Sequence, residues 1–175
     1  MITANNCRRQ IAIAAAIAGM GLIAVCKAAG GNIDACQLIS IAQAGKILGT
    51  KITAHPVNTS AAGPGTASMC SFAGTGIGSG FMLIAGRIHY TSAAQEVARR
   101  EKEALSDTPP GLPRPSFATV KGLGDAAYLA KTSAYFQLHV LANGKVIVVN
   151  RNTTANTKTV REAEEIARAV LAHLQ

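Results

Sequence analysis

A chain of 175 residues is long enough for one domain with a buried core and short for two, and 4% aromatic residues imply a core of small aliphatic side chains. Three of the 17 basic residues, Arg8, Arg9 and Lys27, precede residue 30, which leaves 14 basic against 9 acidic residues, an excess of five positive charges. These bases are scattered without interleaved aromatic residues, which argues against a nucleic-acid-binding protein.

Residues 1–29 have the organisation of an export signal. Two arginines precede an apolar run over residues 11–25, which is short for a transmembrane helix of about 20 residues. The four residues ending at Cys26 are similar to a bacterial lipobox, with Val25 where a small residue is usual, so Cys26 is a candidate lipidation site. The alternative is ordinary signal-peptide cleavage and a secreted product. In both cases we expect residues 30–175 to form a single extracytoplasmic domain, in the periplasm, anchored to a membrane by lipid, or secreted.

Export also predicts which cysteines form a disulfide bond. Cys7 leaves with the leader and Cys26 is either lipidated or removed, so Cys36 and Cys70 remain as an even pair. We expect them to form a disulfide bond, as is common outside the cytoplasm. A metal site at this pair is not expected, because His55 is the only histidine between the two cysteines.

The first half of the domain begins with two consecutive helix starts. Asp34 with Gln37, and Ser40 with Gln43, have the spacing of N-terminal caps. They predict a helical turn and then a helix over residues 41–48 that ends at Gly49. Strands are predicted over residues 51–57, 69–73 and 80–90, the first at a sheet edge because it contains a proline.

The second half is predicted to contain two helices and four strands. A helix capped by Ser92 extends to about Leu105 with a solvated charged side, and residues 107–116, with four prolines, form an extended connection. Strands over residues 117–121 and 126–131 flank a turn that contains two glycines. Thr159 with Glu162 predicts a capping box for a final amphipathic helix.

The clearest structural signal is a β-hairpin over residues 134–151. Asn143-Gly144 is a dipeptide favoured in type I′ turns, and it predicts a register in which Leu138 opposes Val149 and Val140 opposes Ile147. These four residues and Phe136 form one apolar face, which we assign to the core.

Together these elements predict an α+β fold of order α-βββ-α-ββββ-α. The sheet is expected to be antiparallel, with the helices packed on one face. The similar order of the two halves suggests a loose two-fold repeat, for which the residues show no convincing self-similarity.

The sequence contains no arrangement typical of catalysis. Its four histidines occur in separate elements without a His-x-x-x-His spacing, and no Gly-x-Ser-x-Gly motif is present. Asp125 follows a glycine in a predicted turn, where stabilisation of an Asx-type turn is the favoured role. We therefore expect a protein that is not an enzyme, with no catalytic residues, no cofactor and no metal ion.

Three segments of the domain together resemble one protein family. They are residues 34–40 leading into a helix that ends Leu48-Gly49, then Met69-Cys70-Ser71-Phe72, and then residues 120–128 with the pattern Gly-Leu-Gly-Asp-Ala-Ala. They resemble a family of small exported bacterial domains of unknown function, many of them actinobacterial lipoproteins. The resemblance implies an extracytoplasmic domain and no particular reaction.

The predicted sheet offers one candidate face for binding a partner. It combines one side of the strand over residues 80–90 with the side of the hairpin opposite the core; its residues are Arg87, His89, Tyr135, Gln137 and His139. Tyrosine and arginine dominate the energetics of many interfaces, and three further apolar residues, Leu141, Val146 and Val148, would form the centre of the face. The alternative is that this face is solvated or covered by the proline-rich segment.

These observations predict a noncatalytic binding module outside the cytoplasm. The expected partner is another envelope or extracellular protein, with no nucleic acid and with a candidate lipid anchor to a membrane. The alternative function is that of an inhibitor or immunity protein against a periplasmic or extracellular enzyme.

Overall fold

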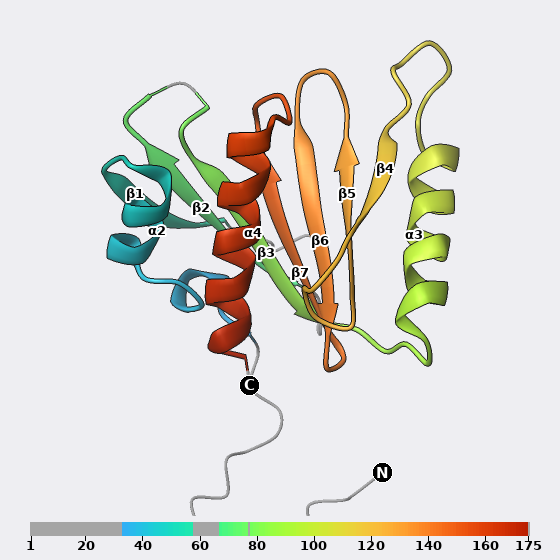
Figure 1. Ribbon diagram of the computed structural model, residues 1–175, viewed down its shortest axis with the longest axis horizontal. Coiled ribbons are helices and arrows are strands. Elements are labelled where there is room, and N and C mark those ends of the chain that lie inside the picture. Colours follow the sequence, from blue (N-terminus) through green and yellow to red (C-terminus); the bar gives the residue numbers. More distant parts are fainter. Residues whose placement is uncertain (1–32, 58–66, 77, 175) are drawn as a thin grey trace, which may run out of the picture. The chain divides into compact units, whose positions relative to one another are not determined.

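The computed structural model describes residues 33–57, 67–76 and 78–174, and Figure 1 shows their arrangement. The predicted export signal at residues 1–29, including Cys26, lies outside the described residues. The described helices and strands belong to a compact unit that spans Asn32–Gln175.

In the described residues, seven antiparallel strands form one sheet, which confirms the predicted α+β class and order of elements. The order across the sheet is β1-β2-β3-β7-β6-β5-β4. The strands are β1 (Ile52–Val57), β2 (Ser68–Gly74), β3 (Phe81–Arg87), β4 (Ser116–Val120), β5 (Ala126–Lys131), β6 (Phe136–Ala142) and β7 (Lys145–Arg151). β1 is an edge strand, as its proline predicts, and β4 forms the other edge.

The helical segments are the 3-10 helix η1 (Ala35–Gln37), α2 (Ile41–Leu48), α3 (Ala93–Ser106) and α4 (Thr157–Ala172). The caps predicted for the first two are confirmed, because the side chains of Asp34 and Ser40 accept hydrogen bonds from the next turn. Gly49 ends α2 in the left-handed conformation, with φ of 64°.

The start of α4 differs from the prediction. Asn156, rather than Thr159, is the N-cap: its side chain accepts a hydrogen bond of 3.0 Å from the N–H of Thr159. The hydroxyl of Thr159 in turn accepts one of 3.0 Å from the N–H of Asn156. The capping box is therefore shifted toward the N-terminus, because a threonine hydroxyl serves where Glu or Gln is usual.

The main core lies between the sheet and the helical segments η1, α2 and α4, the last of which crosses the sheet in Figure 1. The predicted core face of the hairpin is fully buried there; its members are Phe136, Leu138, Val140, Ile147 and Val149. The predicted register is confirmed, with Leu138 opposite Val149 and Val140 opposite Ile147. Asn143 and Gly144 both have positive φ, as a type I′ turn requires.

The helices do not all pack on one face, which corrects one detail of the prediction. Leu141, Val146 and Val148 form a second buried cluster that packs against Ala93 and Val97 of α3. These three hairpin residues alternate with core residues, so they point to the opposite side of the sheet. Because this second side is itself apolar, α3 is needed to remove it from water.

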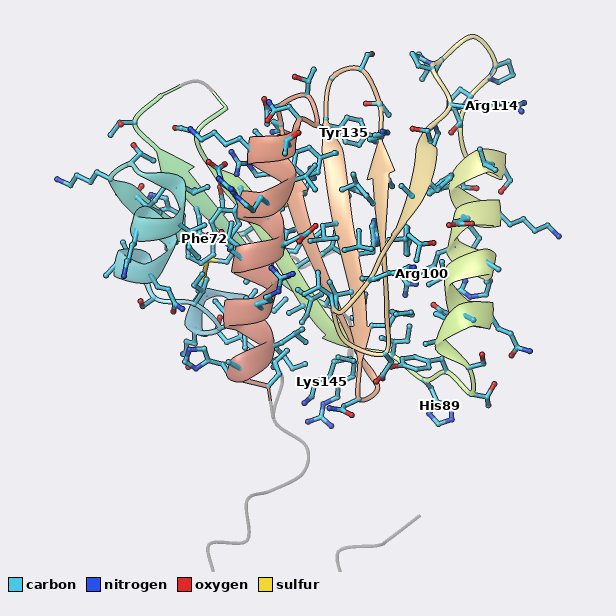
Figure 2. All side chains as sticks on the ribbon, viewed as in Figure 1. Phe72, His89, Arg100, Arg114, Tyr135 and Lys145 are labelled. Atoms are coloured by element: carbon cyan, nitrogen blue, oxygen red, sulfur yellow. A yellow bond between two sulfur atoms is a disulfide. The ribbon has the colours of Figure 1, made fainter. Side chains whose placement is uncertain are left out.

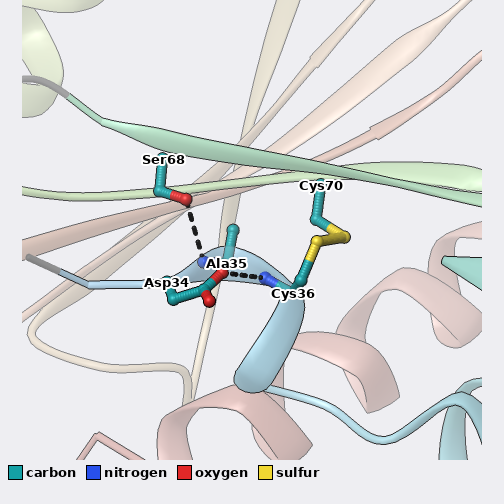
Figure 3. The surroundings of a disulfide bond; sticks show 5 residues. All are labelled: Asp34, Ala35, Cys36, Ser68 and Cys70. Atoms are coloured by element: carbon teal, nitrogen blue, oxygen red, sulfur yellow. Dashed lines mark hydrogen bonds between the residues drawn. A yellow bond between two sulfur atoms is a disulfide. The ribbon is translucent and has the colours of Figure 1, made fainter. Parts of the chain in front are cut away.

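The predicted disulfide bond joins Cys36 of η1 to Cys70 of β2 (Figure 3). Cys70 is fully buried, and the N–H of Ala35 donates a hydrogen bond of 3.0 Å to the hydroxyl of Ser68 nearby. The bond and the hydrogen bond together attach the first helical segment to the sheet.

Candidate binding groove

A groove with a volume of about 640 Å³ lies on the side of the sheet that carries α3. Its walls are the second half of α3 and the proline-rich segment that follows, and its floor is formed by β4, β5 and β6. We call this site the α3 groove. Its volume is within the range of about 300 to 1,000 Å³ that is usual for ligand sites.

Aromatic rings form much of the floor. Tyr128 and His139 are opposite each other on β5 and β6, and their rings stack with centroids 4.5 Å apart. Phe117 of β4 lies beside Tyr128, with ring centroids 6.2 Å apart. Burial raises the pKa of Tyr128 to about 12, so its hydroxyl stays protonated at neutral pH. These aromatic rings therefore bring no charge to the floor near neutral pH.

His139 is also held without charge. Its Nε2 lies 3.0 Å from the side-chain oxygen of Gln137, which can only accept, so Nε2 carries the proton. Its Nδ1 is buried and has no hydrogen-bond partner in the described part of the chain. Burial, followed by the charge of Arg100, lowers the pKa of His139 to about 4. The imidazole is consequently neutral wherever the pH is near 7.

Arg100 lines the groove from α3, and its charge is balanced by a buried carboxylate. Its Nε donates to Glu96 at 2.6 Å, and Glu96, which is buried, also accepts hydrogen bonds from Arg99. Hydrogen bonds from Arg99 and Arg100 outweigh desolvation and lower the pKa of Glu96. Arg99 also pairs with Glu103, so two arginines face two carboxylates, and among the described lining residues the groove presents no unbalanced positive charge to an anionic ligand.

Exposed apolar side chains extend the groove at its rim. Leu112, from the proline-rich segment, is 59% exposed, and Tyr135, from the turn between β5 and β6, is 41% exposed. The carboxylates of Glu103 and Asp107 line the wall formed by α3. Contiguous apolar surface that is rimmed by polar groups is characteristic of an interaction site.

The structure brings three of the five predicted face residues together. Tyr135, Gln137 and His139 all line the α3 groove. The predicted apolar centre of the face is not available beside them, because α3 covers Leu141, Val146 and Val148. The alternative that the proline-rich segment covers this face holds in part, since that segment forms one wall.

Arg87 and His89 do not belong to this surface. Arg87 is opposite Lys145, whose ammonium group donates to the carbonyl oxygen of Leu174 just after α4, so Arg87 lies on the face that α4 covers. His89 lies beyond the end of β3 and is exposed. Figure 2 places it at the end of the sheet opposite Tyr135. The prediction that the five residues share one surface is wrong, because pairing with β7 turns Arg87 to the α4 face and β3 ends before His89.

The sequence reasoning did not single out Phe117, Tyr128, Leu112 or Arg100. Tyr128 carried a usable signal, because it alternates in β5 with the core residues Ala127 and Leu129 and so must point to the other face. Arg100 gave no such signal, since it occurs in a charged run that is typical of a solvated helix surface.

Asp125 forms hydrogen bonds at another part of the sheet, the turn between β6 and β7. Its carboxylate accepts hydrogen bonds from the hydroxyl of Tyr90 at 2.7 Å and from the N–H of Asn143 at 2.9 Å. These two hydrogen bonds lower the pKa of Asp125. The predicted Asx-type turn is therefore replaced by long-range hydrogen bonds, through which Asp125 stabilises the turn of the neighbouring hairpin. At Gly124 a Cβ atom would clash with the carbonyl oxygen of Leu141, so this glycine permits the close approach.

No group of three or more His, Cys, Asp or Glu side chains in the described residues is placed to hold a metal ion. None of the helices in the described part of the chain is both long and apolar enough to cross a membrane. Comparisons with protein-family models, with curated proteins and with solved structures found no match.

Proposed function

We propose that this protein is a noncatalytic extracytoplasmic binding module that holds part of another protein in the α3 groove. The observation that carries the proposal is a groove of about 640 Å³ with an aromatic floor and with Leu112 and Tyr135 exposed at its rim. Removing these apolar side chains from water against a partner is favourable. Tyrosine offers a large contact area at a small cost in conformational entropy.

The ionisable groups of the groove support binding rather than catalysis. A general acid or base works best when its pKa is near the working pH, whereas the pKa of His139 is about 4. The carboxylate of Glu96 is occupied by two arginines.

Three features support a location outside the cytoplasm. Disulfide bonds such as Cys36–Cys70 persist mainly in oxidising compartments. The apolar run over residues 11–25 is that of an export signal, and Cys26 is the candidate site of lipid attachment. The resemblance to small exported bacterial domains has the same implication.

Site-specific photocross-linking tests the proposal. The whole chain carries a benzophenone amino acid in place of Tyr135, and cells that export it are irradiated. We expect one predominant cross-linked protein, which mass spectrometry identifies. The matched control carries the same group in place of Ile41, an apolar residue of α2 that is 49% exposed and does not line the groove.

The cross-link must depend on the groove. Adding Leu112→Ala should reduce its yield severalfold, whereas adding Ile41→Ala should leave it unchanged. Equal capture from both positions, or capture from neither, would overturn the proposal. If the captured protein is an extracellular enzyme that loses activity on binding, the module is an inhibitor, which is the alternative function.

A further inference from the structure

Among the described strands, β4 is a sheet edge that pairs on one side only. β5 is the one strand that pairs with it in the described residues, and no described helix packs extensively against it. Figure 1 shows β4 at the margin of the sheet. Alternate residues of such an edge direct their N–H and C=O groups away from the sheet, where another strand can pair with them.

The other edge of the sheet is protected against pairing. β1 contains Pro56, which lacks an N–H group, and Lys51 immediately precedes the strand. The helical segments α2 and η1 also pack against β1. Proline, lysine and covering helices are the devices by which proteins block edge strands. β4, with the sequence Ser-Phe-Ala-Thr-Val, contains neither a charge nor a proline, although Pro115 precedes it and Lys121 follows it. The difference between the two edges is therefore Pro56 within β1 and the helical segments that cover β1.

A strand added to β4 would run along the α3 groove. Neighbouring strands lie about 4.8 Å apart, and directly opposite residues point to the same face. Phe117 lines the groove, whereas its neighbour Ala118 points to the other face and is exposed. One set of alternate side chains in the added strand would therefore lie beside Phe117 at the groove, and the other set would lie beside Ala118.

The groove also limits the chemistry of these side chains. His139 is neutral and the charge of Arg100 is balanced by Glu96, whereas Glu103 and Asp107 also line the groove, so the described lining residues disfavour an acidic segment. The aromatic floor and the exposed Leu112 favour apolar side chains instead.

We propose that β4 accepts an extended segment of the partner protein, without acidic residues, as an eighth strand, with apolar side chains at alternate positions that enter the α3 groove. This inference rests on the proposed function and specifies how the partner is recognised. Main-chain hydrogen bonds supply affinity in this mode of binding, and the groove supplies specificity.

Peptide selection followed by hydrogen exchange tests the inference. A phage-displayed library of random peptides is selected against the whole chain, and the most enriched peptide is synthesised. With saturating peptide, exchange of alternate amide protons in residues 116–120 should slow about tenfold or more, as measured by NMR. The amides of β1 are the matched control and should be unchanged. The bound peptide should have apolar residues at alternate positions, and Tyr135→Ala should weaken its binding.

The possible results separate this inference from the proposed function. A peptide that binds in a Tyr135-dependent manner without protecting β4 would overturn strand addition and leave the groove as the site. Failure to select any peptide would overturn the inference, while photocross-linking from Tyr135 decides the proposed function independently. Protection of β4 in the free protein that disappears on dilution would mean that a second copy of the chain occupies the edge, which also overturns the inference.

Discussion

His139 is the residue whose ionisation should make the domain sensitive to mild acid. Its pKa is lowered from 6.5 to about 4 in the fold, chiefly by burial and then by Arg100. Above pH 6.5 the residue is neutral in both the folded and the unfolded chain, so it makes no difference to stability there. As the pH falls below 6.5, the unfolded chain binds a proton that the folded chain does not, and stability decreases until about pH 4.

We expect the His139 effect to remove about 2 kcal/mol of unfolding free energy between pH 7 and pH 5. His139→Phe keeps a ring against Tyr128 but cannot titrate, so its stability should change much less over this range. Urea denaturation at several pH values measures both slopes. The carboxyl groups of Glu96 and Asp125 have lowered pKa values and should affect stability only in stronger acid. Equal slopes in the two proteins would contradict the prediction.

Asp125 should matter for stability in spite of its exposed position. It accepts hydrogen bonds from Tyr90 and from the N–H of Asn143 in the hairpin turn. Asp125→Ala removes both and should lower the unfolding free energy by about 1 to 2 kcal/mol, measured by chemical denaturation. Tyr90→Phe removes one of the two and should cost about 1 kcal/mol. If Asp125→Ala is as stable as the wild type, water replaces these hydrogen bonds without loss.

At the scale of elements, α4 is joined to β7 by a buried ion pair. Arg151 donates to Glu162 at 3.0 Å, and their side chains are only 4% and 11% exposed. Arg151 also donates to the carbonyl oxygen of Gly78, at 3.4 Å, in the loop between β2 and β3. Removing one partner of such a pair leaves a buried charge without compensation, which costs far more than the pair itself contributes.

Glu162→Ala should therefore destabilise the domain by about 3 to 5 kcal/mol in a denaturation experiment. The matched control is Glu164→Ala in the same helix, which breaks an exposed pair with Arg168 and should cost less than about 1 kcal/mol. Replacing Arg151 and Glu162 together with Met and Leu should recover much of the loss. Similar losses in the two single variants would show that Arg151 finds another partner.

Contacts between elements also determine on which side of the sheet α3 packs. Its apolar residues Ala93 and Val97 could pack on any apolar surface, and both faces of the hairpin are apolar. α3 packs on the second face because α4, α2 and η1 cover the first one. This packing leaves the second half of α3 and the proline-rich segment as walls around Tyr128 and His139.

For the whole molecule, the disulfide bond should supply a large share of stability. It links residues that are 34 positions apart. Closing a loop of this length lowers the conformational entropy of the unfolded chain, which stabilises the folded state by about 3 to 4 kcal/mol. Replacing Cys36 and Cys70 by Ser should lower the unfolding free energy by that amount. Alkylation of the purified protein without reductant, followed by mass spectrometry, should find both cysteines unmodified. Modification of both would contradict the disulfide bond and weaken the case for export.

Interactions between residues that are close in the sequence determined much of the fold. The Asn143-Gly144 turn has one favoured geometry, and it sets the pairing of β6 with β7 without help from distant residues. The caps at Asp34 and Ser40 and the end of α2 at Gly49 are likewise contacts within a few residues. The pairing of Cys36 with Cys70 followed from counting the cysteines that remain if residues 1–29 are an export signal.

The tertiary structure alone decided which residues form the α3 groove. Alternation within one strand shows which of its residues point to the same side. Which residues of two distant strands point to the same side depends on the register of the strands across the sheet. The pairing of β3 with β7 placed Arg87 on the α4 face, and the pairing of β5 with β6 placed Tyr128 against His139. The groove therefore arises from contacts between segments far apart in the chain, which local sequence patterns do not encode.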